Sequence, residues 1–203
     1  MKKIETIWHH ILNEALQEGK FRHTQQGLAR RFQYSLSTVY HALRAPAAMG
    51  AIHKAGKFFV LQDFKKLLYY WASFRTLTRD LIYSTATSLP VREIEGLALP
   101  GSLYGAYSAA RKLLGEPAAD YSKVYFYILP EYLPDFRRRF PPHSKQPANT
   151  FALKMLPVMG GYGTTTTFAQ TFVDLWNLTD WYAREFTQAL EEKIDGLLSR
   201  TRH

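Results

Sequence analysis

The chain has 203 residues, of which 46% are hydrophobic and 21% charged, a globular composition that excludes intrinsic disorder and collagen-like repeats. It contains no cysteine, which excludes disulfides, thiolate metal sites and cysteine nucleophiles and fits a reducing compartment. The N-terminal residues do not form a signal peptide, and no window is apolar over the roughly 18 residues of a membrane span. We therefore expect a cytoplasmic protein with no membrane partner.

The net charge of +9 is concentrated near the N-terminus. Residues 1–66 hold eleven Lys and Arg side chains against four Asp and Glu side chains, a net charge of +7. The remaining residues therefore carry only +2. This distribution predicts a polyanionic partner for the N-terminal part of the chain. A basic surface that serves solubility alone is the alternative.

Three helices are predicted in the first 48 residues. Apolar side chains at helical spacing indicate a first helix that ends at Gly19. Thr24 is a good N-cap for a short helix over residues 25–32, and Ser35 for a third helix that runs to about Ala48.

A β-hairpin is predicted directly after these helices. Two short runs of strand-like residues flank Ala55 and Gly56, and basic residues stand at the predicted tip. Pro46, near the end of the third helix, is expected to shorten or kink that helix.

Helix, helix, tight turn, helix and basic hairpin is an order that resembles the winged helix-turn-helix of transcriptional repressors. The matching residues are 27–43 and 49–52, about a third of the chain with the hairpin included. In such proteins a small residue, here Ala29, lets the second helix of the motif pack closely, and Ser35 begins the recognition helix. The residues expected to face inward from that helix are Leu36, Val39 and Leu43.

The resemblance implies that the third helix enters the major groove of double-stranded DNA while the hairpin follows the flanking backbone or minor groove. The residues of this helix expected to be exposed to DNA are Ser35, Ser37, Thr38, Tyr40, His41 and Arg44. Arg44 is a candidate for contact with either a guanine or a phosphate. The residues expected to contact phosphates elsewhere are Arg30, Arg31, Lys54 and Lys57.

Residues 67–88 are interpreted as a connector, helical and unusually aromatic. Such a helix is either a dimerisation or docking surface or one more core helix. The predicted organisation is thus a DNA-binding domain over residues 1–66, this connector, and an α/β domain over residues 89–203 that binds a partner or regulates. The fold class is α+β.

An α/β alternation is predicted from residue 89 onward. A loop feeds a helix that ends near Gly115, and the later helices include a last one that is apolar at Trp181 among other positions. The other elements expected are strands over residues 123–129 and 150–156 and helices over residues 133–140, 168–176 and 180–198.

The turn over residues 101–105 resembles the glycine-serine motif of the nucleotidyltransferase fold, where backbone N–H groups at a helix start could hold a phosphate. An active enzyme of this kind needs paired carboxylates on the following strand, because two metal ions bridge the transferring phosphate. That strand has no acid, and Asp120 stands alone before it. We expect no enzyme activity and no cofactor. A nucleotide-transferring enzyme with carboxylates from other positions, whose winged helix binds nucleic acid, is the alternative.

Nearly the whole chain resembles the antitoxin-repressors of AbiE-type abortive-infection systems, a type IV toxin–antitoxin family. The matching stretches are residues 97–106, 124–127 and 167–176. The resemblance implies an autoregulator that binds its own promoter, a C-terminal domain that is a non-catalytic relative of the nucleotidyltransferase fold, and a partner toxin that is itself a nucleotidyltransferase. Monomer and homodimer remain open, as does a winged helix used for protein contacts alone.

Three further signals favour structural explanations. Asp174, among apolar neighbours, is expected to be a hydrogen-bond acceptor. The run Arg137-Arg138-Arg139 is expected to be a solvated face, with contact to DNA or an acidic partner as the alternative. Five histidines lie in the first third of the chain, but they lack paired i, i+4 spacing and no cysteine accompanies them, so we expect no metal site. They are His9, His10, His23, His41 and His53.

Overall fold

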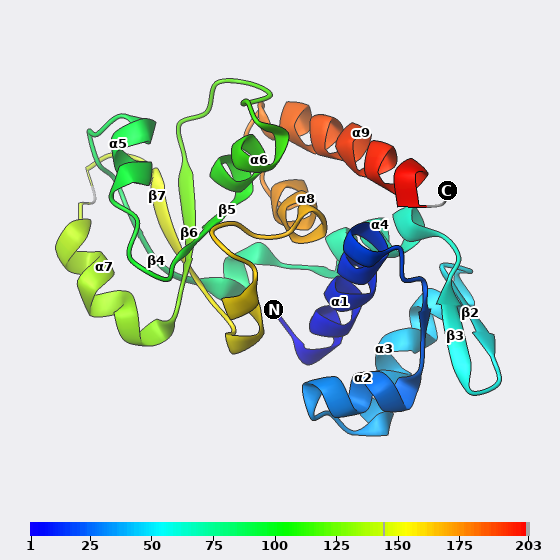
Figure 1. Cartoon of the computed structure of the whole chain (residues 1–203). Coiled ribbons are helices and arrows are strands. Elements are labelled where there is room, and N and C mark those ends of the chain that lie inside the picture. Colours follow the sequence, from blue (N-terminus) through cyan, green and yellow to red (C-terminus); the bar gives the residue numbers. More distant parts are fainter. Residues whose placement is uncertain (144, 202–203) are drawn as a thin grey trace. The chain divides into compact units, whose positions relative to one another are not determined.

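The computed structural model describes residues 1–143 and 145–201, and it divides the chain into two compact units (Figure 1). Unit 1 contains Met1–Arg75 and the chain from Glu192 onward, and unit 2 contains Thr76–Glu191. The described residues form nine α-helices and two small sheets, so the fold is α+β. None of the helices in this part of the chain has the length and apolar character that crossing a membrane requires.

Four helices build unit 1, and local hydrogen bonds set their ends. They are α1 (Lys3–Glu18), α2 (Gln25–Phe32), α3 (Leu36–Ala48) and α4 (Phe64–Phe74). Gly19 ends α1 in the left-handed conformation, with φ of 62°. The Thr24 side chain accepts a hydrogen bond from the Gly27 N–H, and the Ser35 side chain accepts one from the Thr38 N–H. The predicted N-caps are therefore confirmed.

Pro46 lies inside α3 and does not end it. The helix continues for two residues beyond the proline, to Ala48. The helix ends at Ala48, as predicted, so Pro46 does not break it, and the kink expected there stays a prediction. The side chain of Pro46 is buried, and its ring takes part in the packing of unit 1.

The sheet of unit 1 contains the predicted hairpin and one unpredicted strand. The hairpin strands β2 (Ile52–Ala55) and β3 (Phe58–Leu61) pair antiparallel, and β1 (Arg22–His23) pairs antiparallel with the other side of β3. The strand order is therefore β1-β3-β2. Two residues are too few to show an alternating pattern, which is why the sequence did not indicate β1.

Helix α4 packs inside unit 1, against α1. Leu67, Leu68 and Trp71 are buried, as expected for the core-helix alternative. The end of α9 (Ala183–Thr201) joins the same unit, where the Asp195 carboxylate lies 2.7 Å from the Lys65 ammonium. The stretch interpreted as a connector is therefore divided: its first part is α4, and its later part includes a strand of unit 2.

The sheet of unit 2 has four strands in the order β4-β7-β6-β5. They are β4 (Leu81–Thr85), β5 (Leu103–Gly105), β6 (Val124–Ile128) and β7 (Thr150–Lys154). β6 and β7 run parallel, and the outer strands pair antiparallel with them. The two predicted strands are confirmed as β6 and β7. β4 and β5 were not predicted.

All five residues of β6 are buried, which places this strand in the core of unit 2. Val124, Phe126 and Ile128 belong to a cluster with Phe136 of α7 (Leu133–Arg139). On the opposite face, the Tyr127 hydroxyl donates a hydrogen bond to Asp174 of α8 (Phe168–Trp176). Figure 1 shows α5 and α7 on one side of the sheet and α6 and α8 on the other. The helices are α5 (Val91–Gly96), α6 (Ala106–Leu114), α7 (Leu133–Arg139), α8 (Phe168–Trp176) and α9 (Ala183–Thr201).

Three short 3-10 helices are also present among the described residues, at Leu77–Asp80, Pro130–Tyr132 and Pro157–Gly161.

Trp181 stands before α9 and is 76% exposed, so the expectation that it belongs to the apolar face of that helix is wrong. The helix begins at Ala183, two residues after Trp181, so the indole lies outside it.

Candidate nucleic-acid interface

Most of the predicted DNA-contacting residues of α3 lie on its solvent side. Ser35, Ser37, His41 and Arg44 are exposed, and the Tyr40 side chain is 48% exposed. The Tyr40 and His41 rings meet edge-on, with centroids 5.7 Å apart. These positions form a polar and aromatic surface along the helix.

Thr38 is less exposed to a DNA partner than the sequence suggests. It is half-buried, and its hydroxyl lies 2.9 Å from the hydroxyl of Ser35. Because the Thr38 N–H also bonds to Ser35, this threonine belongs to the N-cap of α3. Its first role is to hold the start of the helix.

Leu36 does not face inward. Val39 and Leu43 are fully buried as expected, but Leu36 is 50% exposed. Leu36 lies four residues before Tyr40, and residues at this spacing share one helix face. The exposed surface of α3 therefore includes an apolar side chain in its first turn.

The hairpin places basic side chains next to α3. His53, Lys54 and Lys57 are exposed, and the Lys54 ammonium lies 4.8 Å from the centroid of the Tyr40 ring. This cation–π contact joins the β2–β3 hairpin to the exposed face of α3. Arg30 and Arg31 are also exposed, in the last turn of α2, where cations suit the helix dipole.

The turn at residues 101–105 contains the short strand β5 (Leu103–Gly105) and leads directly into α6, whose N-cap is Gly105. The Ser102 hydroxyl donates to the Leu99 carbonyl at 2.7 Å, and strand β5 follows before α6 begins at Ala106. Gly105 packs against the Tyr127 ring, where an added Cβ would come within 3.0 Å of a ring carbon. The predicted helix start after this turn is therefore confirmed, and a phosphate held at that start stays a prediction.

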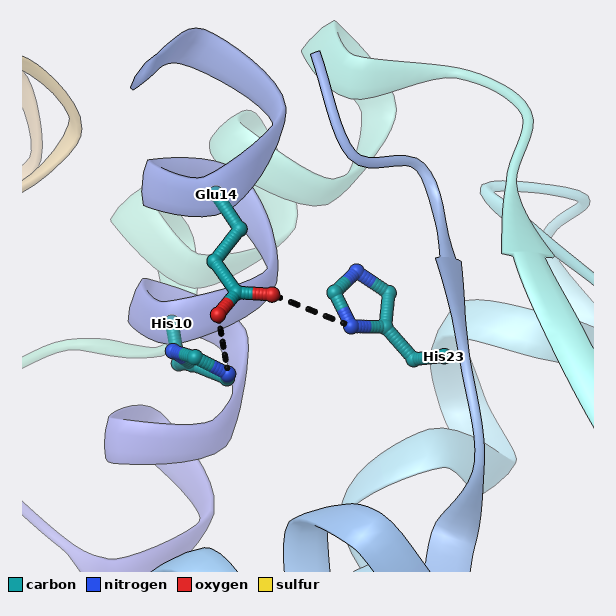
Figure 2. Close-up of side chains that lie close together, drawn as sticks. All are labelled: His10, Glu14 and His23. Carbon is teal, nitrogen blue, oxygen red and sulfur yellow. Dashed lines mark ion pairs between the residues drawn. The ribbon is translucent and has the colours of Figure 1, made fainter. Parts of the chain in front are cut away.

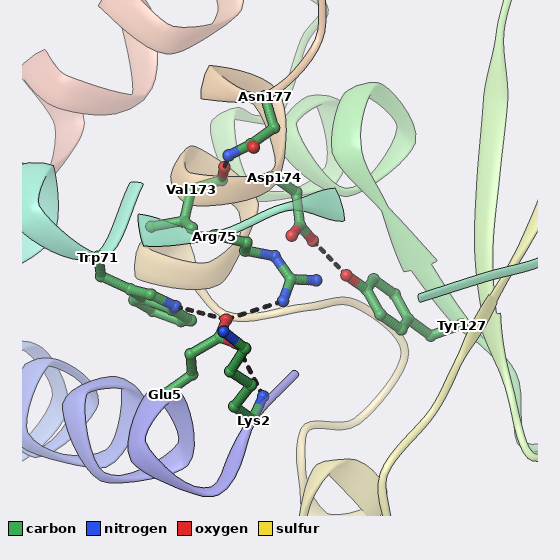
Figure 3. A network of polar contacts seen from close by, with 8 residues as sticks. All are labelled: Lys2, Glu5, Trp71, Arg75, Tyr127, Val173, Asp174 and Asn177. Carbon is green, nitrogen blue, oxygen red and sulfur yellow. Dashed lines mark hydrogen bonds and ion pairs between the residues drawn. The ribbon is translucent and has the colours of Figure 1, made fainter. Parts of the chain in front are cut away.

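Three acidic side chains of unit 2 are held by hydrogen bonds from basic or tyrosine side chains. Asp174 is fully buried and accepts a bond of 2.7 Å from the Tyr127 hydroxyl, which confirms the expected acceptor role (Figure 3). Glu95 accepts bonds from Arg111 at 2.7 Å and from Tyr121 at 2.6 Å. Asp180 accepts bonds from Lys123 and Tyr107. Asp120 is exposed before β6.

A polar group in unit 1 ties the start of α1 to the end of α4. The Glu5 carboxylate accepts hydrogen bonds of 3.1 Å from both the Trp71 indole and the Arg75 guanidinium, and one of 2.8 Å from the Lys2 backbone N–H (Figure 3). These contacts explain why α4 belongs to the first unit.

Two of the histidines come together with a glutamate, as Figure 2 shows. His10 Nε2 lies 3.2 Å from one oxygen of Glu14, and His23 Nδ1 lies 3.6 Å from the other. Burial lowers the pKa of His10 to about 4 and also lowers the pKa of His23, against the opposing effect of the Glu14 charge. Both imidazoles are therefore neutral at pH 7.

Sequence reasoning missed this group because it looked for histidine pairs. The available signal was a histidine followed four residues later by a glutamate, which places His10 and Glu14 on one face of α1. His23 reaches them from β1, the strand that the sequence did not indicate.

The Arg137-Arg138-Arg139 run is exposed, as a solvated face requires, while Arg139 donates to the carbonyls of Leu97 and Ala98.

Comparison of this chain with protein-family models, with curated proteins and with solved structures found no match.

Proposed function

We propose that the protein is a transcriptional repressor that binds double-stranded DNA through α3 and the β2–β3 hairpin. The observation that carries the proposal is the contact between Lys54 and Tyr40, because it presents a basic hairpin and an exposed helix face as one surface. A helix and an adjacent hairpin fit the major groove and the flanking backbone, respectively.

The charge of unit 1 supports the same proposal. Arg30, Arg31, Arg44, Lys54 and Lys57 are all exposed. DNA binding releases counterions in proportion to the phosphates that such side chains neutralise. Arg44 lies late in α3, where either a base or a phosphate is within the reach of a guanidinium.

On the strength of the sequence resemblance, we further propose an antitoxin-type autoregulator that acts in the cytoplasm on its own promoter. Unit 2 then has a binding role, toward a toxin of the nucleotidyltransferase type. The hydrogen bonds that hold Glu95, Asp174 and Asp180 support a structural use of these acids, since metal-dependent phosphoryl transfer requires carboxylates available to metal ions.

The test uses the full chain and two fluorescent duplexes of equal length, one from the region upstream of its own gene and one with the same bases scrambled. Anisotropy at several salt concentrations is expected to show tighter binding to the promoter and affinity that falls steeply with salt. Equal affinity for both duplexes would limit the proposal to nonspecific binding, and no binding at low salt would contradict it. Incubation with labelled nucleoside triphosphates and Mg²⁺ is expected to give no product, and a labelled product would favour the enzyme.

A further inference from the structure

We propose that His10, Glu14 and His23 form a binding site for a divalent transition-metal ion of the zinc class. Each offers a ligand atom, and these atoms all lie within 4.8 Å of one another. Among the residues that the structure describes, no other group of three or more His, Asp or Glu side chains meets this condition. The site lies wholly within unit 1, between α1 and β1, and its three ligands are not among the residues proposed to contact DNA.

The spacing of the ligand atoms suits a tetrahedral ion. Zinc bonds of about 2.0–2.2 Å to nitrogen and oxygen keep tetrahedral ligands about 3.3–3.5 Å apart. The two distances to Glu14, 3.2 Å from His10 Nε2 and 3.6 Å from His23 Nδ1, are close to this separation, and they end at different oxygens of the carboxylate. With one ligand atom from each residue, the three atoms lie within 4.8 Å of one another, so any pair has to approach by at most about 1.5 Å.

The chemistry of the three side chains also suits a metal. All three are less than one-tenth exposed, and imidazole nitrogens and carboxylate oxygens are ligands that zinc binds in proteins. The His23 ring is stacked on Phe59, with centroids 5.6 Å apart, which holds the imidazole in place.

Cationic side chains surround the site and oppose a metal ion. Lys20 is the most important, because its ammonium lies 2.6 Å from the Glu14 oxygen that faces His23. Arg22 and Arg31 line the same cavity of about 430 Å³. The Lys20 side chain is 49% exposed, so it has room to turn into solvent when an ion takes its place. A ligand position beyond the three side chains is left for water from the cavity.

The role of Lys20 separates a metal site from an ordinary buried ion pair. If the three residues only stabilise the fold, removing the Lys20 charge weakens the group by leaving Glu14 with fewer partners. If they bind a metal, the same change removes a competitor for the carboxylate and tightens metal binding. Lys20→Met keeps a long unbranched side chain and removes the ammonium group with its charge.

The experiment titrates the chelator-treated full chain with Co²⁺, whose visible absorption reports tetrahedral coordination, and then displaces the Co²⁺ with Zn²⁺. We expect one ion per chain, at least about a tenfold loss of affinity in His23→Ala and Glu14→Gln, and several-fold tighter binding in Lys20→Met. His53→Ala, which changes an exposed histidine of β2, is the matched control and is expected to bind as the parent does.

Thermal unfolding supplies a second readout. A hundredfold excess of Zn²⁺ over its Kd is expected to raise the melting temperature of the parent by roughly 5 °C, with no change in His23→Ala. Circular dichroism establishes that each variant is folded. No Co²⁺ band and no thermal shift in the parent would overturn the proposal. An equal loss of metal affinity in His53→Ala, or weaker metal binding in Lys20→Met, would also overturn the proposal, whatever the result with DNA.

Discussion

The indole Nε1 of Trp8 in α1 donates a hydrogen bond of 2.7 Å to the carbonyl oxygen of Ala42 in α3. In a regular helix that carbonyl would accept the N–H of residue 46, four positions later. Pro46 has no N–H, so Trp8 satisfies the acceptor that the proline leaves free. This bond between two helices explains how α3 continues past Pro46.

Replacing Trp8 with Phe tests this explanation. The change leaves the Ala42 carbonyl buried without its donor and removes part of a ring that packs edge-on against Tyr70 and Phe74. We expect the free energy of unfolding to fall by about 2–4 kcal/mol, measured by urea denaturation.

The control for this prediction is the same change in a Pro46→Ala background. Residue 46 then has an N–H that can bond to the Ala42 carbonyl, so Trp8→Phe is expected to cost about 1 kcal/mol less than in the parent. An equal cost in both backgrounds would mean that the indole hydrogen bond contributes nothing and that packing accounts for the whole effect.

The contact between Lys54 and Tyr40 is expected to contribute measurably to unit 1. Lys54→Met and Tyr40→Leu each remove one partner, and a double-mutant cycle isolates their interaction. For a cation–π contact at an exposed site we expect a coupling of about 0.5–1 kcal/mol in the free energy of unfolding. A coupling near zero would show that the hairpin and α3 do not hold each other in solution.

Phosphate contacts of the hairpin are expected to appear in the salt dependence of DNA binding. Lys54→Ala and Lys57→Ala should weaken binding to promoter and scrambled duplexes alike, and each should reduce the slope of log affinity against log salt by roughly 0.9. Lys154→Ala, at an exposed position in unit 2, is the control and should leave the slope unchanged. A slope that is unchanged in all three variants would show that Lys54 and Lys57 do not contact phosphates.

Substitutions on the exposed face of α3 are expected to affect DNA binding differently from substitutions in the hairpin. His41→Ala and Leu36→Ala should leave the salt slope unchanged and cost roughly 1–3 kcal/mol on the promoter duplex only, through base contacts or contact with a thymine methyl group. Thr38→Ala should instead lower thermal stability, since its hydroxyl lies against the Ser35 cap. If His41→Ala and Leu36→Ala stay folded and lose both duplexes equally, α3 is not the helix that reads the bases.

Alkaline pH is expected to destabilise unit 2 through Tyr121. Burial and the hydrogen bond to Glu95 raise the pKa of this phenol from its ordinary value near 10 to about 12. Because the folded state disfavours the phenolate, the stabilisation is complete below pH 10 and is lost as the pH rises toward 12, by roughly 1–2 kcal/mol. Tyr121→Phe is expected to reduce the alkaline loss by the share of Tyr121 alone, because burial also raises the pKa of other tyrosines in unit 2, namely Tyr104, Tyr107, Tyr125 and Tyr162.

Urea unfolding between pH 8 and 11.5 measures the difference between the parent and Tyr121→Phe. Tyr132→Phe, which changes an exposed tyrosine, serves as the control and should behave as the parent does. A parent and a Tyr121→Phe variant that lose stability in parallel would show that Tyr121 does not cause the alkaline loss.

The ends of the helices in unit 1 could be predicted because they depend on neighbours in the chain. Gly19 supplies a left-handed residue, and Thr24 and Ser35 each accept a hydrogen bond from an N–H three positions later. β6 and β7 could also be predicted from their apolar runs, whereas β4, which has the same length, could not, because only Thr85 among its five residues is buried. β1 and β5 could not, because strands of two and three residues exist only through their pairing with β3 and β6.

The sequence by itself determined the α+β composition, the helix caps, the hairpin and the basic character of the first 66 residues, all of which follow from local hydrogen bonding, periodicity and charge. Only the tertiary structure decided that Leu36 faces solvent, that Trp8 supports α3 at Pro46, and that His23 meets His10 and Glu14. These outcomes depend on which distant segments pack together. Packing of this kind is set by the summed burial and pairing of a whole unit, which no short stretch of residues encodes.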